Sequence, residues 1–383
     1  MNLAYVTPYD ARSLKGSQTW SGTGYYIAQS LERQLFNLEY FGPFKNGLIC
    51  QLNQRYKRSY HKLFNKKYLN NPTPCILKNY AKQITSKLLK TRIDLIFSAS
   101  ANPIAYLECR QPIVFWADAS FASLLDFYPN YINLCQETIR DWHRLEQLAH
   151  QKCQLAIYSS DWAAQAAISH YGVNKAKVKV VPFGANIEAE NKLYEIKDWI
   201  QSRPNNLCKL LFLGVDWHRK GGDIALKVAM ELNKAGLNTE LTIVGCRPTG
   251  EESLPKFAKS LGFISKSTDQ GKAKISQLIA ESHFLLLPSL ADCTPIVLCE
   301  ANSLGVPCLT TNIGGIPTII KDNLNGKTFD STADPLEYCS YISSLFTDYS
   351  SYVDLALSSF SEYQSRLNWT VAGKTVKNLL SEI

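Results

Sequence analysis

Short apolar runs alternate with longer amphipathic stretches along almost the whole chain of 383 residues. This alternation predicts parallel strands covered by helices on both faces of a sheet. In the first half, the predicted strands are Leu3–Thr7, Ile93–Phe97, Ile113–Trp116, Leu155–Tyr158 and Val178–Val181. In the second half, they are Lys209–Leu213, Leu241–Val244, Phe284–Leu287 and Cys308–Thr310.

The length of the chain suits two domains. The alternation is interrupted between Asn186 and Leu207, where the chain is polar and contains Pro204. We therefore expect an N-terminal Rossmann-like domain over residues 1–185 and a C-terminal Rossmann-like domain over residues 186–368.

Composition narrows the class of protein. A hydrophobic fraction of 45% suits globular cores, and no apolar run is long enough to predict a transmembrane helix. The N-terminal segment MNLAYVTPYDARS has no basic region followed by an apolar stretch, so it predicts a first strand and not a signal peptide. The eleven cysteines are dispersed without the spacing of metal ligands, which predicts free thiols in a cytoplasmic protein.

The net charge of +8 is concentrated in one stretch that has no acidic residue between Glu39 and Asp94. Its cations are Lys45, Arg55, Lys57, Arg58, Lys62, Lys66, Lys67, Lys78, Lys82, Lys87, Lys90 and Arg92. Aromatic residues recur among them at every fourth position, which places them on one face of a helix. These residues are Tyr56, Tyr60, Phe64 and Tyr68.

Two interpretations of this basic stretch remain open. A basic helix with an aromatic stripe suits an anionic membrane surface, which residues 55–92 would contact from the cytoplasmic side. Alternatively, the stripe faces the core and the cations are solvated. Nucleic acid is not the expected partner, because no nucleic-acid-binding motif accompanies the charge.

The segment ADCTPIVLCEANSLGVPCLTT, residues 291–311, predicts a helix start directed at an anion. Thr294 suits the N-cap and Pro295 suits the first helical position. The amides of Ile296 and Val297 then lack partners within the helix, and such amides bind phosphate groups well.

Two carboxylates flank this helix start, Asp292 before it and Glu300 within the helix. Gly305 is predicted at the C′ position, and Pro307 prevents continuation of the helix. Paired carboxylates also occur in glycosidases. Their position around a helix start favours instead a phosphate with sugar hydroxyls on either side, although a surface acid is the structural alternative for each.

Arg219 and Lys220 follow the predicted strand Lys209–Leu213 and precede Gly221 and Gly222. A lysine near a helix start is unfavourable unless it faces an anion. The two glycines weaken the helix and suggest close approach of a ligand. A solvated basic turn is the alternative.

A second glycine turn, Gly22, Thr23 and Gly24, precedes a predicted helix over about Tyr25–Leu35 and offers amides in the same way. It is also compatible with an ordinary turn. Asp118 follows a predicted strand, where acidic residues of open sheets often face a ligand. Capping of a helix before Ser120 would explain Asp118 equally well.

The segment from Asp292 onward resembles the donor-site motif of retaining family 4 glycosyltransferases, which carry two acidic residues eight positions apart. Three other blocks are similar to that family: VKVVPFGAN (178–186), LLFLGVDWHRKGGDIAL (210–226) and NIGGIPTIIKDNLNGKTF (312–329). The resemblance implies a GT-B fold, which is an α/β fold of two doubly wound Rossmann-like domains facing each other across a cleft. It also implies that the last helix, residues 369–383, returns to the first domain.

The resemblance implies transfer of a sugar, with retention of configuration, from a nucleotide-sugar donor to an acceptor hydroxyl. It implies a UDP- or GDP-linked donor, no further cofactor and no metal ion in the chemical step. Asp118, Lys220 and Asp292 are the expected catalytic residues, and Glu300 is expected to bind the ribose. The expected donor-binding residues are Gly22, Thr23, Gly24, Gly214, Arg219, Lys220, Asp292, Cys293, Thr294, Pro295, Ile296, Val297 and Glu300.

The chain departs from the family pattern at three positions. Val215 stands where the family usually has arginine, Asp292 where it has glutamate, and Thr318 where it has an acidic residue. A histidine is frequent in the family near the position of Asp118. A noncatalytic membrane-associated protein of the same fold therefore remains an alternative, as do a nucleotide-sugar epimerase and a sugar phosphorylase. The acceptor is not predicted.

Overall fold

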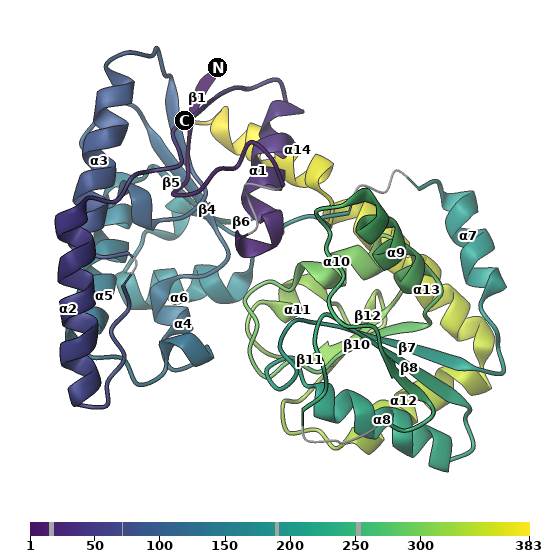
Figure 1. The fold of residues 1–383 in the computed structure, drawn as a ribbon. Helices are drawn as coiled ribbons and strands as arrows, with labels where there is room; N and C mark the ends of the chain where they lie inside the picture. The colour runs from purple at the N-terminus through teal and green to yellow at the C-terminus, as the bar shows by residue number, and fades with distance from the viewer. Residues whose placement is uncertain (15–18, 71, 188–190, 250–253) are drawn as a thin grey trace. The chain divides into compact units, whose positions relative to one another are not determined.

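The computed structural model describes the chain except for residues 15–18, 71, 188–190 and 250–253. The chain forms two compact units, each a parallel sheet flanked by helices (Figure 1). Unit 1 comprises Met1–Pro182 and Ala372–Ile383, and unit 2 comprises Phe183–Val371. The fold class predicted from the sequence, two doubly wound Rossmann-like domains, is confirmed.

Unit 1 contains a six-stranded parallel sheet with the order β2-β1-β3-β4-β5-β6. Its strands are β1 (Asn2–Val6), β2 (Asn37–Tyr40), β3 (Leu95–Ser98), β4 (Ile113–Ala117), β5 (Leu155–Tyr158) and β6 (Val178–Val180). Its helices are α1 (Thr23–Glu32), α2 (Leu48–Leu63), α3 (Pro74–Leu88), α4 (Phe121–Leu124), α5 (Gln136–Lys152), α6 (Asp161–Tyr171) and most of α14 (Trp369–Leu380). β1, β3, β4 and β5 are buried along nearly their whole length, as continuous apolar runs predict.

Unit 2 contains a second six-stranded parallel sheet, with the order β12-β11-β10-β7-β8-β9. Its strands are β7 (Cys208–Leu213), β8 (Thr239–Val244), β9 (Ala258–Ser260), β10 (Phe284–Leu287), β11 (Cys308–Thr311) and β12 (Gly326–Phe329). Its helices are α7 (Leu193–Ser202), α8 (Gly222–Lys234), α9 (Asp269–Ala280), α10 (Ile296–Asn302), α11 (Ile316–Ile319), α12 (Pro335–Thr347) and α13 (Tyr349–Arg366). From β7 the chain builds first toward β9 and then, from β10, in the opposite direction, so the strand order reverses between β7 and β10.

The polar stretch at the predicted domain boundary contains α7. Ile196 and Ile200 of this helix are fully buried in the core of unit 2. At the far end of the chain, α14 packs closely against α1, because a Cβ at Gly373 would lie 2.6 Å from the carbonyl oxygen of Ser30.

Helix α2 presents the aromatic stripe to the outside. Tyr56, Tyr60 and Phe64 are exposed, so the core-facing alternative is wrong for them, whereas Tyr68 lies beyond the helix and is buried. Leu52 and Leu63 extend the exposed stripe along the same face, which we call the apolar stripe of α2. Within the residues described, no helix is long and apolar enough to cross a membrane.

The prediction that all thiols are free is wrong for two of the cysteines. Cys50 in the first turn of α2 and Cys75 in the first turn of α3 form a disulfide. The sequence pattern missed it because the two residues are separated by 25 positions and lie on different helices. Among the other described cysteines, seven are buried and two are partly buried, all with free thiols.

The core of unit 1 contains a neutral pair of titratable groups. Burial raises the pKa of Glu146 to about 8 and lowers the pKa of His150 to about 4. His150 Nε2 lies 3.7 Å from Glu146 Oε2 and 3.2 Å from the hydroxyl of Tyr158. At neutral pH both groups are therefore mainly uncharged, and the contact is not an ion pair.

We predict that Glu146 makes unit 1 less stable as the pH rises from about 4.5 to about 8. Its pKa rises on folding, so the folded state holds a proton that the unfolded state loses above pH 4.5. Stability should then fall by about 1.4 kcal/mol per pH unit up to about pH 8 from this group alone. Glu146→Gln is uncharged at every pH, so its urea unfolding should show a shallower decline between pH 6 and 8. Parallel pH profiles of the two proteins would contradict this assignment.

Candidate functional site

Two loops of unit 2 meet where its strand order reverses. One follows β7 and carries Arg219 and Lys220, and the other follows β10 and carries Asp292. The backbone N–H of Leu290 donates to the carbonyl oxygen of Arg219 at 2.7 Å and holds the loops together. The crevice at the carboxyl ends of such diverging strands is the usual ligand position in open α/β sheets.

Lys220 and Asp292 form an ion pair between these loops, and both side chains are about nine-tenths buried. Arg219 lies alongside, with Nη1 3.8 Å from Asp292 Oδ2 and 3.0 Å from the carbonyl oxygen of Ala291. The hydroxyl of Ser289 donates to the same carboxylate at 3.4 Å. The three charged groups at the centre of this site carry a net positive charge, as an anion-binding site requires.

Asp216 modifies this balance at the edge of the site. One of its carboxylate oxygens lies 3.4 Å from Arg219 Nε, and its side chain is about half exposed. Val215, which replaces the arginine of the family pattern, is 66% exposed. Since valine carries no charge, the two cations beside Asp292 are Lys220 and Arg219.

Glycines make the loop geometry possible, but mostly through contacts within the protein. A Cβ at Gly214 would lie 3.0 Å from Lys220 Cγ, so glycine leaves room for the aliphatic part of the lysine. Gly221 has a φ of 76° at the N-cap of α8, where a Cβ would collide with the carbonyl of Pro288. The close neighbours of Gly221 and Gly222 are thus Pro288 and Trp217, and the close approach of a ligand stays a prediction.

Glu300 lies on α10 with no exposed surface. Both of its carboxylate oxygens accept hydrogen bonds from Lys266 Nζ, at 2.5 and 2.6 Å. Lys266 was not predicted. Lys266 lies two residues before Thr268, the N-cap of α9. A capping threonine can be read from the sequence, but it does not show that the nearby lysine binds Glu300.

The start of α10 differs by one residue from the prediction. The helix begins at Ile296, and Pro295 occupies the N-cap with ψ near 97°, so Thr294 is not the cap. Ile296 and Val297 are the first helical residues. Cys293, between Asp292 and Thr294 in the chain, is buried.

The end of α10 agrees with the prediction for Gly305. This residue has a φ of 62°. Its N–H donates to Asn302 O at 3.1 Å and that of Val306 donates to Ala301 O at 3.0 Å, which together form a Schellman motif.

Buried Arg203, at the end of α7, holds the turn at the C-terminal end of α10 in place. Its guanidinium donates to the carbonyl oxygens of Leu304 and Gly305 at 3.1 and 2.8 Å, and to the hydroxyl of Tyr352 at 2.7 Å. The short helix that carries Glu300 is therefore fixed at its C-terminal end.

In unit 1, the glycine turn lies at the start of α1. Gly22 has a φ of 80° at the N-cap, and Thr23 is buried. The carbonyl oxygen of Gly24 accepts a hydrogen bond from the hydroxyl of Tyr5 at 2.6 Å, and a Cβ at Gly24 would lie 2.7 Å from the hydroxyl of Tyr9. The close approach that requires glycine here is the packing of Tyr9.

Asp118 follows β4 and accepts a hydrogen bond from Trp20 Nε1 at 2.7 Å. The alternative that Asp118 caps the next helix is wrong, because Ser120 caps α4 in a reciprocal pair with Ser123. The structure therefore brings Asp118 together with the loop that precedes Gly22. Within unit 2 it brings together Arg219, Lys220 and Asp292.

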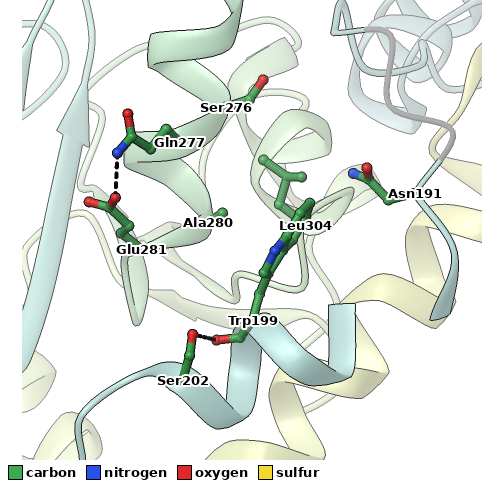
Figure 2. A pocket seen from close by; sticks show the side chains of 8 residues that line it. All are labelled: Asn191, Trp199, Ser202, Ser276, Gln277, Ala280, Glu281 and Leu304. Atoms are coloured by element: carbon green, nitrogen blue, oxygen red, sulfur yellow. Dashed lines mark hydrogen bonds between the residues drawn. The ribbon is translucent and has the colours of Figure 1, made fainter. Parts of the chain in front are cut away.

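A separate pocket of about 440 Å³ lies between α7 and α9 in unit 2. Figure 2 shows its lining side chains, with the hydrogen bond of 2.7 Å from Gln277 to Glu281. None of the described residues that line it carries a positive charge. The pocket does not contain the charged cluster, and we do not assign the anion site to it.

Comparison with known proteins agrees with this architecture. Over the full length of both chains, the structure is similar to that of Anabaena Alr3699/HepE in complex with UDP, with a TM-score of 0.65 and 15% sequence identity. The two parallel sheets and this similarity define the GT-B class of fold.

Residues 24–189 match the family described as Glycosyltransferase Family 4, and residues 194–359 match Glycosyl transferases group 1. The chain belongs to the family 4 glycosyltransferases.

Two curated relatives illustrate the range of similar proteins. D-inositol 3-phosphate glycosyltransferase of Paenarthrobacter aurescens (strain TC1) is 24% identical over 193 residues, which cover 48% of this chain and 47% of the relative. Lipopolysaccharide glucosyltransferase WaaG of Escherichia coli (strain K12) is 30% identical over 164 residues, which cover 40% and 42%. The chain spans about half the length of the curated relatives it matches.

We predict strong coupling between Lys220 and Asp292 in stability. Lys220→Met should lower the free energy of unfolding by about 3 kcal/mol, because it leaves a buried carboxylate without its main partner. Asp292→Asn should be destabilising for the converse reason. The double variant should lose clearly less than the sum of the two, which denaturant unfolding of all four proteins measures. Additive losses would show that the two groups do not interact.

Proposed function

We propose that this chain transfers a sugar from a nucleotide-sugar donor to a hydroxyl group of an acceptor. The observation that carries the proposal is the cluster of Arg219, Lys220 and Asp292 between the carboxyl ends of β7 and β10. Nucleotides bind at this position of doubly wound sheets. Family membership and the similarity to a protein that binds UDP support a UDP- or GDP-linked donor.

In this proposal the buried lysine exchanges partners when the donor binds. Lys220 leaves Asp292 for the diphosphate, and Arg219 adds a second positive charge. Asp292 is then free to accept a hydrogen bond from a hydroxyl of the sugar. Charge that develops on the leaving diphosphate meets cations that are already desolvated and positioned, which is commonly a large term in catalysis.

Glu300 is proposed to accept hydrogen bonds from the ribose, with Lys266 holding its carboxylate in place. The amides of Ile296 and Val297, and the backbone from Cys293 to Pro295, would line the same side of the donor. For unit 1 we propose that the turn of Gly22, Thr23 and Gly24 contacts the donor and that Asp118 lies near the reacting sugar.

We further propose retention of configuration and no metal ion in the chemical step. Lys220 and Arg219 supply positive charge at the leaving group, which is one of the roles of a divalent ion. The anomeric configuration of the product, determined by NMR, tests the first point. Activity in the presence of a chelator tests the second.

We predict that Lys220→Met reduces kcat/KM about a hundredfold, since loss of one charge-stabilising contact costs on the order of 3 kcal/mol in the transition state. Glu300→Gln should reduce it about tenfold or more, because it weakens the hydrogen bond of a charged carboxylate to the ribose. Lys227→Met, which removes an exposed lysine of α8, is the matched control and should be nearly as active as the wild type. Release of UDP or GDP from a donor panel measures turnover, and thermal melting shows that the variants are folded. Near-normal turnover in both variants would refute the donor-site assignment.

The exposed side chains of α2 support a second part of the proposal, which is binding of the protein to a membrane surface. The apolar stripe of this helix lies beside a row of exposed cations, Arg55, Arg58 and Lys62. Cations beside an apolar stripe are typical of an amphipathic helix that lies in the membrane interface, and we propose that α2 contacts an anionic membrane in this way. Lys57 does not belong to this surface, because it points inward and pairs with Glu137.

We predict binding to anionic vesicles and not to neutral ones, with about 1 kcal/mol from each cation near the bilayer. Arg55→Glu, Arg58→Glu and Lys62→Glu together should release the protein in co-sedimentation. The same charge change at Lys197, Lys227 and Lys256, exposed lysines of unit 2, should have little effect. Tyr56→Ser with Leu63→Ser should remove the part of the binding that salt does not screen. Absence of binding by the wild type at low salt would exclude the membrane surface.

A further inference from the structure

The first turns of α2 and α3 are joined covalently. Cys50 and Cys75 tie them together, so both helix starts border the same space. No side chain caps either start, although Gly47 and Thr73 hold the N-cap positions. The positive ends of two helix dipoles therefore converge.

A cavity of about 870 Å³ lies between these helices and is lined by both N-cap residues and by the disulfide. Three lysines, Lys57, Lys78 and Lys82, also line it. The amides of Asn53, Gln54 and Asn79 and the phenol of Tyr68 add polar groups. Tyrosine is protonated at neutral pH in any case, and burial raises the pKa of Tyr68 further, so its hydroxyl is a donor.

The side chains that line this cavity carry a net positive charge, because the lysines outnumber the carboxylates. Asp141 is the one carboxylate among the described lining residues, and it accepts hydrogen bonds from Arg140 at 3.2 and 3.3 Å. Lys57 is neutralised by Glu137, outside the lining. Lys78 and Lys82 make no ion pair with any described carboxylate, and Lys78 lies 5.3 Å from the ring centre of Tyr106.

The cavity and the apolar stripe occupy neighbouring faces of α2. Cys50, Gln54 and Lys57 face the cavity, and Leu52, Tyr56, Tyr60 and Leu63 face outward. With 3.6 residues per turn, Asn53 lies between these two faces. A molecule with an anionic head in the cavity could thus extend its apolar part around α2 onto the stripe.

We propose that this cavity binds the phosphate headgroup of a membrane lipid. The inference rests on the proposed membrane binding of α2 and adds a stoichiometric site to it. Lys78 and Lys82 meet the phosphate together with the two helix starts, and the acyl chains lie along the apolar stripe. Diffuse attraction between a basic surface and a bilayer would need no cavity and would not distinguish these lysines from others.

The test compares two variants with the same loss of charge. Lys78→Gln with Lys82→Gln removes the unpaired cations of the cavity. Lys90→Gln with Arg92→Gln removes two exposed cations of the same basic stretch, outside the cavity lining. Dihexanoyl phosphatidic acid, kept below its micellar concentration, is the probe for calorimetric titration. Glycerol 3-phosphate is the soluble probe without acyl chains.

The wild type should bind one short-chain lipid per chain, and glycerol 3-phosphate should compete but bind at least tenfold more weakly. The cavity variant should lose at least tenfold in affinity, and the control variant less than threefold. Equal losses in both variants would overturn the site, even where wild-type vesicle binding persists. Equal affinity for the two probes would assign the cavity to a soluble phosphate and overturn the lipid. Failure of the wild type to bind any vesicle would instead refute the membrane proposal itself.

Discussion

The ion pair of Lys220 and Asp292 is the constraint on which the candidate site depends. Removal of two charges from water is costly, and a buried pair recovers that cost only when its geometry is good. The surrounding residues supply that geometry: Gly214 leaves room for the lysine stem, and the turn at Gly221 packs against Pro288. A buried ion pair contributes little net stability compared with a well-packed apolar pair of similar volume, so the fold alone does not require these two charges.

Asp292 and Glu300 have different proposed roles at the same short helix, α10. Asp292 precedes α10 and holds the lysine, whereas Glu300 lies within the helix and is held by Lys266. Helix α10 has only seven residues, so its own hydrogen bonds fix it weakly. The Schellman motif at Gly305 and the guanidinium of Arg203 supply the missing rigidity from the opposite end.

The sequence predicted those features that depend on local chemistry. Buried parallel strands are continuous apolar runs, and β5 and β10 were predicted with their observed bounds. The strands β2, β9 and β12 were missed, because they lie at the edges of the two sheets, are only partly buried and lack a continuous apolar run. Gly305 was predicted correctly because a left-handed residue at a helix end is a local requirement, whereas the extended conformation of Pro295 was not readable.

Partners that are distant in sequence were beyond prediction. Lys266 and Glu300 are joined only by the fold, and so are Cys50 and Cys75. The contacts of Gly24 with Tyr9 and of Gly222 with Trp217 were likewise not readable from the sequence, because only the fold brings these aromatic rings close.

The return of the chain to unit 1 has a consequence for biosynthesis. Residues 372–383 belong to unit 1, and Gly373 packs against α1, which leaves the ribosome before unit 2. Unit 2 lies wholly between them in the chain, so it can complete its core during translation while unit 1 still lacks one of its helices. The surface of α1 that receives α14 therefore stays uncovered until all of unit 2 has been synthesised. A nascent chain that stalls late would carry a finished unit 2 and an unfinished unit 1.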